Sequence, residues 1–416
     1  MKICIHRGTQ EIGGTCIELE AQGKRIALDI GMPLDADQSD DPASLLPPVR
    51  GFRESDDDLL GVVVSHPHID HFGLASFLRP DLPVYIGEAA SNILKAASRY
   101  VPGGIYFENA AHYSNGAPTE IGPFTITPYL MDHSAYDAYG LLIAAGDKRI
   151  YYSGDFRGHG RKRALFEAFL SRPPQDLDVL MMEGTTIGRE GTDGIFPSES
   201  DLEDVFISDI EKCAGMYLVY ASSQNIDRIV TLFRAAKRTG RKLVMDLYSA
   251  AVLKATGNDR IPQSDWDDVR LYVPFRQRIL VKKKELFADL NAHNSNRVFD
   301  HHLKAAPKNY VLLFRPGMHL DKGITNASAG ARFAYSMWGG YLAQEKMGSF
   351  KEWLAERDIS LTHIHTSGHA GPSDLKRLAA ALAPKKLVPI HSFETGRFAE
   401  LFDNVETKQD GEWWSV

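Results

Sequence analysis

The sequence predicts a mixed α/β protein with more than one domain. In the first 155 residues short strand patterns dominate, and 16–20 and 25–30 read as a hairpin joined by Ala-Gln-Gly. From about residue 200 strands and helices alternate, as in strand 217–221, amphipathic helix 225–239 and strand 242–246. This alternation favours a parallel sheet covered by helices. The length, 416 residues, is typical of two or three domains.

The remaining predicted elements follow from the same periodicities. Gly146 and Asp147 form a tight-turn pair between two of the strands. The further strands are expected at 59–64, 124–131, 139–145, 149–153, 310–314 and 386–390, and the further helices at 72–79, 88–100, 162–171 and 373–382.

Composition and charge narrow the class of protein. The chain is 44% hydrophobic and 24% charged, which is typical of a globular protein, and its formal net charge is −7. That charge argues against a surface coated with basic residues, although a local basic channel is compatible with it. Three cysteines are too few for a disulfide framework. Because the sequence starts without a signal-peptide pattern and has no long apolar run, we expect a cytoplasmic protein that has no membrane partner.

Residues 65–73, Ser-His-Pro-His-Ile-Asp-His-Phe-Gly, crowd four side chains that can bind metal into six positions. These side chains are His66, His68, Asp70 and His71. They follow the buried strand pattern at 59–64, which would hold them rigidly. Imidazole and carboxylate groups suit zinc and similar metals, and burying so many ionisable groups without a metal is costly. The cluster therefore predicts a metal site.

Two metal ions need more ligands than this cluster supplies. Suitable groups follow three other predicted strands: His133 after 124–131, Asp155 after 149–153 and His391 after 386–390. A single histidine at a strand end is usually a structural residue, so His133 and His391 taken alone are weak candidates. Together with the cluster they make a complete ligand set for two ions.

The pattern His66-x-His68-x-Asp70-His71 resembles the signature of the metallo-β-lactamase fold. The resemblance implies an αββα sandwich with a dinuclear metal site, commonly zinc, with manganese as the alternative. Asp29, in Ala-Leu-Asp-Ile-Gly, resembles the acid that lies behind the ligands in this fold. The ligands that the resemblance implies are His66, His68 and His133 for one ion, Asp70, His71 and His391 for the other, and Asp155 as the bridge.

Later motifs resemble the β-CASP branch of this fold, whose members are nucleases of nucleic-acid processing. Glu183, in Met-Glu-Gly-Thr-Thr, resembles its motif A, and His369, in Thr-Ser-Gly-His-Ala, resembles motif B. His391, in Pro-Ile-His, resembles motif C, where histidine favours RNA over DNA. Residues 220–228 resemble the start of the domain that this branch inserts into the fold.

Within the branch, residues 365–370, His-Thr-Ser-Gly-His-Ala, are most similar to the ribonuclease J family. Two positions depart from that family: motif A is Glu183 where the family has aspartate, and His391 is followed by Ser-Phe-Glu. The sequence ends 25 residues after His391, so a short form without the family's C-terminal domain is expected.

The resemblance also implies a mechanism. We expect a hydroxide that bridges the two ions to attack the phosphodiester in line, with Asp70 helping to orient it. His369, paired with Glu183, is the expected general acid that protonates the leaving oxygen, because a carboxylate partner raises the pKa of an imidazole.

Other side chains are candidates for contacts with RNA. Ser222 and Ser223 precede helix 225–239, and Ser367 and Gly368 offer backbone amides that suit a phosphate. For the two earlier serines the alternative is a helix N-cap. The basic stretches 157–163 and 276–284 would track an RNA backbone or simply face solvent.

The expected domains are a hydrolase domain, residues 1–195 and 355–416, and an inserted α/β domain, residues 196–354. The leading function is a metal-dependent ribonuclease that acts on single-stranded RNA as an exonuclease, an endonuclease or both. The rivals are a DNA nuclease or small-ester hydrolase of the same fold, and a catalytically silent RNA-binding subunit. Every expected ligand is present, which argues against the silent subunit. A homodimer is compatible with the sequence.

Overall fold

The computed structural model describes residues 1–34, 36, 41–189 and 195–416. The chain divides into two compact units. The first comprises Met1–Lys95, Ile105–Phe196 and Gly368–Val416, and the second comprises Ala96–Gly104 and Pro197–Ser367. None of the helices in the described ranges has the length and apolar character needed to cross a bilayer.

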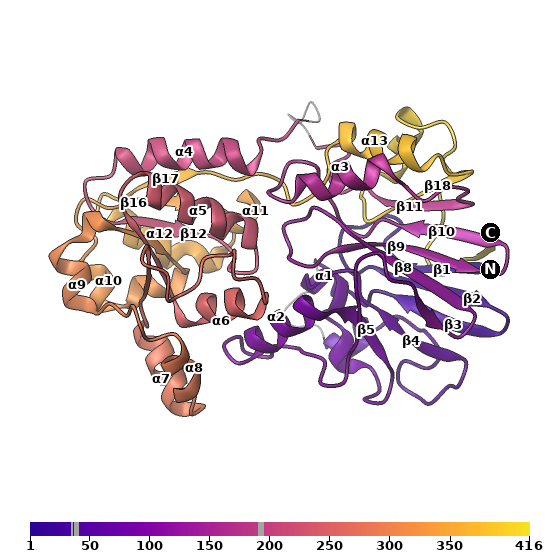
Figure 1. Cartoon of the computed structure of the whole chain (residues 1–416), viewed down its shortest axis with the longest axis horizontal. Coiled ribbons are helices and arrows are strands. Elements are labelled where there is room, and N and C mark those ends of the chain that lie inside the picture. Colours follow the sequence, from indigo (N-terminus) through magenta and orange to yellow (C-terminus); the bar gives the residue numbers. More distant parts are fainter. Residues whose placement is uncertain (35, 37–40, 190–194) are drawn as a thin grey trace. The chain divides into compact units, whose positions relative to one another are not determined.

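Two sheets face each other in the first unit (Figure 1). The strands of the first sheet, in spatial order, are β19 (Trp413–Ser415), β1 (Lys2–Arg7), β2 (Cys16–Ala21), β3 (Lys24–Leu28), β4 (Leu59–Val63), β5 (Val84–Gly87) and β6 (Ala111–Tyr113). The strands of the second sheet are β18 (Lys386–Ile390), β11 (Val179–Glu183), β10 (Lys148–Tyr152), β9 (Tyr139–Ala145), β8 (Phe124–Leu130) and β7 (Thr119–Ile121).

The side chains on the two faces of the first sheet pack into two different hydrophobic cores. Along β2 and β3, Ile17, Leu19 and Ile26 point into a core shared with strands of the second sheet. Cys16 and Ala27, on the opposite face, pack under helices, as the period of two along a strand requires. Apolar residues therefore occupy both faces of the first sheet.

Helices cover the outer faces of both sheets. α1 (Ile69–Phe72) and α2 (Glu88–Ser98) pack on the first sheet, while α3 (Arg163–Ser171) and α13 (Pro372–Leu382) lie together over the second (Figure 1). Short 3-10 turns are η1 (Pro42–Leu45), η2 (Ala75–Phe77) and η6 (Thr395–Glu400). This helix–sheet–sheet–helix order confirms the predicted αββα sandwich.

The helix predicted at 72–79 is wrong. One α-helical turn ends at Phe72, and the separate turn η2 follows. The backbone between them pairs with the end of β3, since Ile30 donates to the carbonyl of His71 and Leu74 donates to the carbonyl of Ile30. These tertiary hydrogen bonds replace those that a continuous helix would make.

The second unit holds a six-stranded sheet whose pairings are all parallel, as the β-α-β pattern predicted. Its strands, in spatial order, are β14 (Val269–Leu271), β13 (Lys242–Met245), β15 (Tyr310–Leu313), β12 (Tyr217–Tyr220), β16 (Arg332–Tyr335) and β17 (Ser360–His363). Because β17 pairs with β16, this unit continues beyond the expected boundary at residue 354, as far as Ser367.

Helices and short turns surround this parallel sheet. The longer helices are α4 (Glu199–Glu211), α5 (Ile226–Arg238), α6 (Leu247–Ala255), α7 (Phe275–Lys283) and α12 (Gly348–Ala355). The shorter elements are α8 (Phe287–Ala292), α9 (Asp300–Ala305), η3 (Pro307–Asn309), η4 (Pro316–Leu320), α10 (Lys322–Asn326), α11 (Gly339–Leu342) and η5 (Glu345–Met347).

Candidate metal centre

Strand direction explains why distant residues meet at one edge of the second sheet. β9 pairs antiparallel with both β8 and β10, while β11 pairs parallel with β10 and β18. The strands β8, β10, β11 and β18 therefore run the same way and end at the same edge. His133 and Asp155 follow β8 and β10 by three residues, Glu183 is the last residue of β11, and His391 directly follows β18.

The histidine-rich segment reaches this edge from the first sheet. It follows β4 and enters the helical turn α1, which contains Asp70 and His71. Gly31 lies so close that a Cβ atom there would be 1.7 Å from the carbonyl oxygen of Asp70. Only glycine allows the two backbones to approach in this way.

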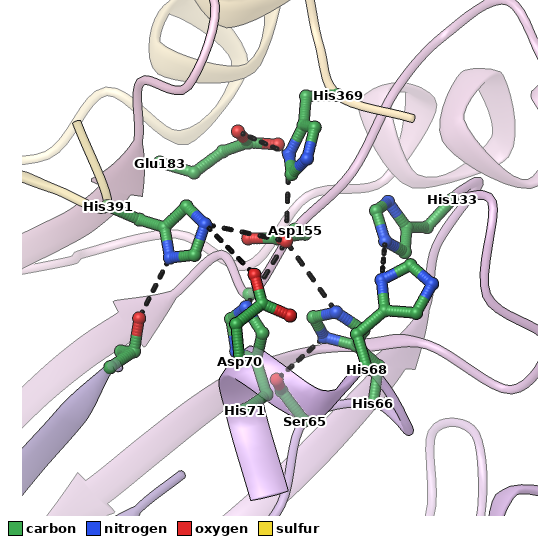
Figure 2. Close-up of polar contacts among 12 residues, drawn as sticks. Ser65, His66, His68, Asp70, His71, His133, Asp155, Glu183, His369 and His391 are labelled. Carbon is green, nitrogen blue, oxygen red and sulfur yellow. Dashed lines mark hydrogen bonds and ion pairs between the residues drawn. The ribbon is translucent and has the colours of Figure 1, made fainter. Parts of the chain in front are cut away.

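The first group of ligand atoms comes from His66, His68, His133 and Asp155, which lie within 4.8 Å of one another (Figure 2). His133 Nε2 is 3.1 Å from His68 Nδ1. Nitrogen atoms of two imidazole rings that point at each other in this way suit a shared cation.

The second group is formed by Asp70, His71, Asp155 and His391 within the same limit. Asp155 Oδ2 lies 3.2 Å from His71 Nε2 and 3.9 Å from His391 Nε2, and it also lies 3.6 Å from His66 Nε2 of the first group. Figure 2 shows this carboxylate at the middle of the cluster, with the imidazole rings around it. Asp155 is therefore the residue that both groups share.

The donor atoms fit a pair of divalent cations. Within the described residues, His66 Nε2, His71 Nε2, His391 Nε2 and both carboxylate oxygens of Asp155 are buried without a hydrogen-bond partner. Leaving buried polar atoms unsatisfied costs about 1–3 kcal/mol each. Nitrogen and carboxylate oxygen ligands in two overlapping groups are the set that zinc and related metals bind.

The protonation states of His66, His68, His133 and Asp155 favour metal ligation. Burial lowers the pKa of His66 and of His133 well below the ordinary value, and it lowers the pKa of His68 to about 4. Burial alone would raise the pKa of Asp155, but His391 and His71 hold it well below its usual range. These imidazoles are therefore neutral and this carboxylate is ionised near pH 7, which are the forms that bind metal. Burial acts to lower the pKa of His71, but Asp155 and Asp29 outweigh it and raise that pKa well above the ordinary value, so a metal ion would have to displace a proton there.

Residues behind the ligands orient the rings. Asp29 is fully buried and accepts hydrogen bonds from the backbone N–H of Ser65 at 2.6 Å and from His71 Nδ1 at 2.7 Å. The hydroxyl of Tyr152 also donates to Asp29. Occupying Nδ1 of His71 in this way turns its Nε2 atom toward the centre.

Thr15 orients the ring of His391 in the same way, since its Oγ1 atom lies 2.8 Å from Nδ1 of that ring. Sequence reasoning predicted Asp29 but missed Thr15, Ser65 and Tyr152. Ser65 adjoins the histidine cluster, which is a usable signal. Thr15 directly precedes a strand pattern and Tyr152 belongs to one, and neither position carries such a signal.

A third group joins Asp155 to Glu183 and His369. His369 Nδ1 lies 3.1 Å from Glu183 Oε2 and 3.6 Å from Asp155 Oδ2. Glu183 is held in turn by the backbone N–H of Phe156, 3.0 Å from its Oε1. Burial acts to lower the pKa of His369, but Glu183 and Asp155 outweigh it and raise that pKa above the ordinary value. His369 is thus suited to carry a proton beside the ligands.

The predicted RNA-contacting residues fall in both units. Gly368 adjoins His133, since a Cβ atom there would lie 3.7 Å from the Cε1 atom of that ring and 2.8 Å from Ser134 Oγ. Ser367 is the last residue of the second unit, and Ser222 and Ser223 also belong to that unit.

The helix N-cap alternative for the two serines before α5 is wrong. Asn225 caps α5, because its side chain accepts a hydrogen bond from the backbone N–H of Arg228. Ser222 Oγ accepts from the backbone N–H of Gln224 at 3.2 Å. Ser223 is buried and receives a hydrogen bond of 2.5 Å from Arg315 Nη2.

Comparisons with known proteins agree with this fold. Residues 34–202 match a beta-lactamase superfamily domain, and residues 355–409 match a Zn-dependent metallo-hydrolase RNA specificity domain. A crystal structure of a protein of unknown function from Enterococcus faecalis V583 superimposes with a TM-score of 0.78 at 23% identity, covering 100% of this chain and 99% of that one.

Two similar proteins are ribonuclease J from Mycobacterium tuberculosis (strain CDC 1551 / Oshkosh) and from Helicobacter pylori (strain ATCC 700392 / 26695). The first is 23% identical over 92% of this chain and 67% of its own length. The second is 21% identical over 94% of this chain and 56% of its own length. This chain thus spans between about half and two thirds of those relatives. On the two domain matches and the αββα sandwich, the chain has a metallo-β-lactamase fold with an RNA specificity domain, and over most of its length it is similar to the ribonuclease J proteins.

Proposed function

We propose that this protein is a metal-dependent ribonuclease that hydrolyses phosphodiester bonds of single-stranded RNA. The observation that carries the proposal is the sharing of Asp155 by two ligand groups and by the Glu183–His369 pair. The similarity to ribonuclease J and to an RNA specificity domain supports RNA as the substrate. His391 at motif C favours RNA over DNA as well.

The proposed cofactor is a pair of divalent ions, zinc or manganese, each bound by one of the two groups that share Asp155. Such ions would lower the pKa of bound water toward 7 and offset negative charge on the phosphate oxygens. The chain's own residues supply the rest of the chemistry. To Asp70, in the first turn of α1, we assign the role of accepting a hydrogen bond from the attacking water and so orienting it.

Departure of the leaving oxygen requires a proton, which we assign to His369. Its raised pKa keeps the imidazole protonated near neutral pH, and Glu183 fixes the ring through the 3.1 Å contact with Nδ1. A positioned acid of this kind typically contributes 10²–10⁴-fold to the rate. Gly368, directly before it, leaves space beside His133 that a Cβ atom would restrict.

The test is cleavage of end-labelled, single-stranded RNA and DNA of matched sequence, each bearing either a 5′-monophosphate or a 5′-hydroxyl. The Asp70→Ala/His71→Ala variant should lose about 10³-fold of the wild-type rate on RNA, since a bound metal contributes several kcal/mol to the transition state. The matched control removes the same residue types from the surface, Asp147→Ala/His112→Ala, and should cleave as the wild type does.

Each outcome decides one part of the proposal. A ladder that shrinks from one end means an exonuclease, and internal bands mean an endonuclease. Equal or faster cleavage of DNA would favour the DNA nuclease. Binding of RNA without cleavage by the metal-loaded wild type would favour a silent RNA-binding subunit. Unchanged cleavage by Asp70→Ala/His71→Ala would exclude the metal mechanism.

A further inference from the structure

Figure 1 shows helix α7 in the second unit. Its exposed side chains include both cations and apolar groups. We call this the α7 face and define it as Phe275, Arg276, Ile279, Lys282 and Lys283. All five side chains are exposed, and Phe275 and Ile279 expose 57% and 49% of their surface. At 100° per residue these positions fall on one side of the helix, while Val281 is buried on the other. Residues 274–284 contain no acidic side chain, although the whole chain has a net charge of −7.

A cavity of about 550 Å³ opens beside the α7 face, between α7 and η4. Phe275, Ile279, Met318 and Leu320 supply most of its apolar lining, and Arg276 borders it. Its volume lies in the range of pockets that hold small organic ligands. A largely apolar cavity bordered by guanidinium groups suits a flat, neutral ring that carries a phosphate beside it.

The two carboxylates that line this cavity are already paired. Asp246 accepts hydrogen bonds from Arg315 Nε at 2.8 Å and from Gln277 Nε2 at 2.7 Å. Asp321 accepts from the backbone N–H of Phe275 at 2.6 Å. These acids therefore present little free negative charge to a ligand.

The cations of the α7 face are free by contrast. Across the described ranges of the chain, the side chains of Arg276, Lys282 and Lys283 make neither a hydrogen bond nor an ion pair. Arg276 extends over Gly317, where a Cβ atom would lie 3.1 Å from its Nη1. Lys282 and Lys283 follow Phe275 by two helical turns, about 10 Å along the axis. A strand that placed a ring at Phe275 would bring its phosphates past these side chains.

We infer that the α7 face and its cavity bind single-stranded RNA, with one base seated against Phe275 and the backbone phosphates at Arg276, Lys282 and Lys283. The inference rests on the proposed function for the identity of the strand. Unpaired cations interleaved with an exposed aromatic ring are the arrangement by which proteins hold single strands without reading sequence. A protein partner or a second copy of this acidic chain could also bring carboxylates to the cations, and the test below separates a second copy from RNA.

The test measures RNA binding separately from RNA cleavage. Asp70→Ala/His71→Ala protein, in which RNA stays intact, is titrated into fluorescein-labelled oligouridine of roughly 12 nucleotides while anisotropy is recorded over a series of salt concentrations. Two changes are introduced in this background, Phe275→Ala and Lys282→Ser/Lys283→Ser. The matched controls are Phe287→Ala, on the neighbouring helix α8, and Lys304→Ser/Lys308→Ser, which removes the same charge from the same unit.

The two variants should weaken binding in different ways. Phe275→Ala should raise Kd about tenfold and leave the salt dependence unchanged, because it removes stacking and no charge. Phe275→Tyr should restore most of the affinity. Lys282→Ser/Lys283→Ser should reduce the slope of log Kd against log salt by about 1.4, the value for two phosphate contacts with a single strand. Each control should change Kd by less than about twofold.

Three results would overturn the inference. The first is a change in Kd for Phe275→Ala and for Lys282→Ser/Lys283→Ser that is no larger than the change in their controls, while circular dichroism and Tm show that both variants fold as the wild type does. A second is a salt slope that Lys282→Ser/Lys283→Ser leaves unchanged. The third is unaltered RNA binding together with a shift from dimer to monomer in sedimentation of Phe275→Ala, which would assign the cavity to a second copy of the chain. None of these touches the proposed ribonuclease, whose own test is cleavage by the wild type.

Discussion

Two residues of the candidate metal centre adopt backbone conformations that most residues avoid. Asp29 and His391 have φ angles of 58° and 50°. For a residue with a Cβ atom this left-handed conformation costs about 1–2 kcal/mol. Hydrogen bonds from the same residues offset the cost, since Asp29 N–H donates to Val63 at 2.9 Å and His391 N–H donates to Gly8 at 2.7 Å. Strain at these two positions turns their side chains toward the site.

The pair of Glu183 and His369 predicts a pH dependence. In the proposed mechanism the acid form of His369 protonates the leaving oxygen, and neighbouring carboxylates raise its pKa above the ordinary value. The rate should therefore fall as pH rises through that raised pKa. Glu183→Gln removes the first of those carboxylates and should move the descending limb to lower pH. Rate profiles of the metal-loaded enzyme check this, with the surface variant Glu167→Gln as the control. A limb that Glu183→Gln leaves in place would assign the titration to another group.

At the scale of elements, a buried ion pair joins the first two helices of the second unit. Arg228 on α5 bonds Glu199 on α4 through Nε at 3.1 Å and Nη2 at 2.9 Å, and both side chains are almost fully buried. Arg228 also donates to Ser336, whose hydroxyl donates to the carbonyl of Ile364. The pair thus connects two helices to the segment that leads toward Gly368.

Breaking this pair should destabilise the second unit. Arg228→Leu removes the guanidinium that neutralises the buried carboxylate of Glu199, and the free energy of unfolding should fall by about 3–5 kcal/mol. The double variant Arg228→Leu/Glu199→Leu should recover much of the loss, because it removes both buried charges. Arg234→Ala, which breaks the pair with Glu203 at a mostly exposed arginine of the same helix, should cost less than about 1 kcal/mol. Urea unfolding checks all three, and equal losses in Arg228→Leu and Arg234→Ala would contradict the argument.

For the whole molecule, the ligands are scattered from His66 to His391 along the sequence. They converge only when both sheets of the first unit have formed and packed against each other. An ion bound at this candidate centre would therefore prefer the folded chain to the unfolded one, and its binding free energy would add to the stability of the first unit.

Removal of metal should consequently lower the stability of the first unit. At a free zinc concentration about 1,000 times Kd, the bound ion contributes about 4 kcal/mol, which a chelator would remove. Calorimetry should show that the unfolding transition of the first unit occurs at a lower temperature in chelated protein than in zinc-loaded protein. The transition of the second unit should occur at the same temperature in both. Asp70→Ala/His71→Ala should respond less to zinc than the wild type does. Identical transitions with and without metal would argue against a resident ion.

The sequence by itself determined what is local. The spacing of His66, His68, Asp70 and His71 predicted a metal site. Strand patterns predicted that three further candidate ligands follow strands, namely His133, Asp155 and His391. Alternating apolar and polar residues likewise predicted strands, and the alternation of strands with helices predicted the parallel sheet of the second unit. Such features depend on neighbours within a few residues, and these are fully visible in a sequence.

Only the tertiary structure decided which distant groups meet. The bond of Thr15 to His391 spans 376 positions, and nothing in the sequence implied it. The 3.1 Å contact of Glu183 with His369 spans 186 positions, and only the family resemblance implied it. The break after Phe72 likewise depends on hydrogen bonds to the end of β3. Sheet pairing and strand direction determine such juxtapositions, and no local pattern encodes them, because they arise when strands far apart in the chain share an edge.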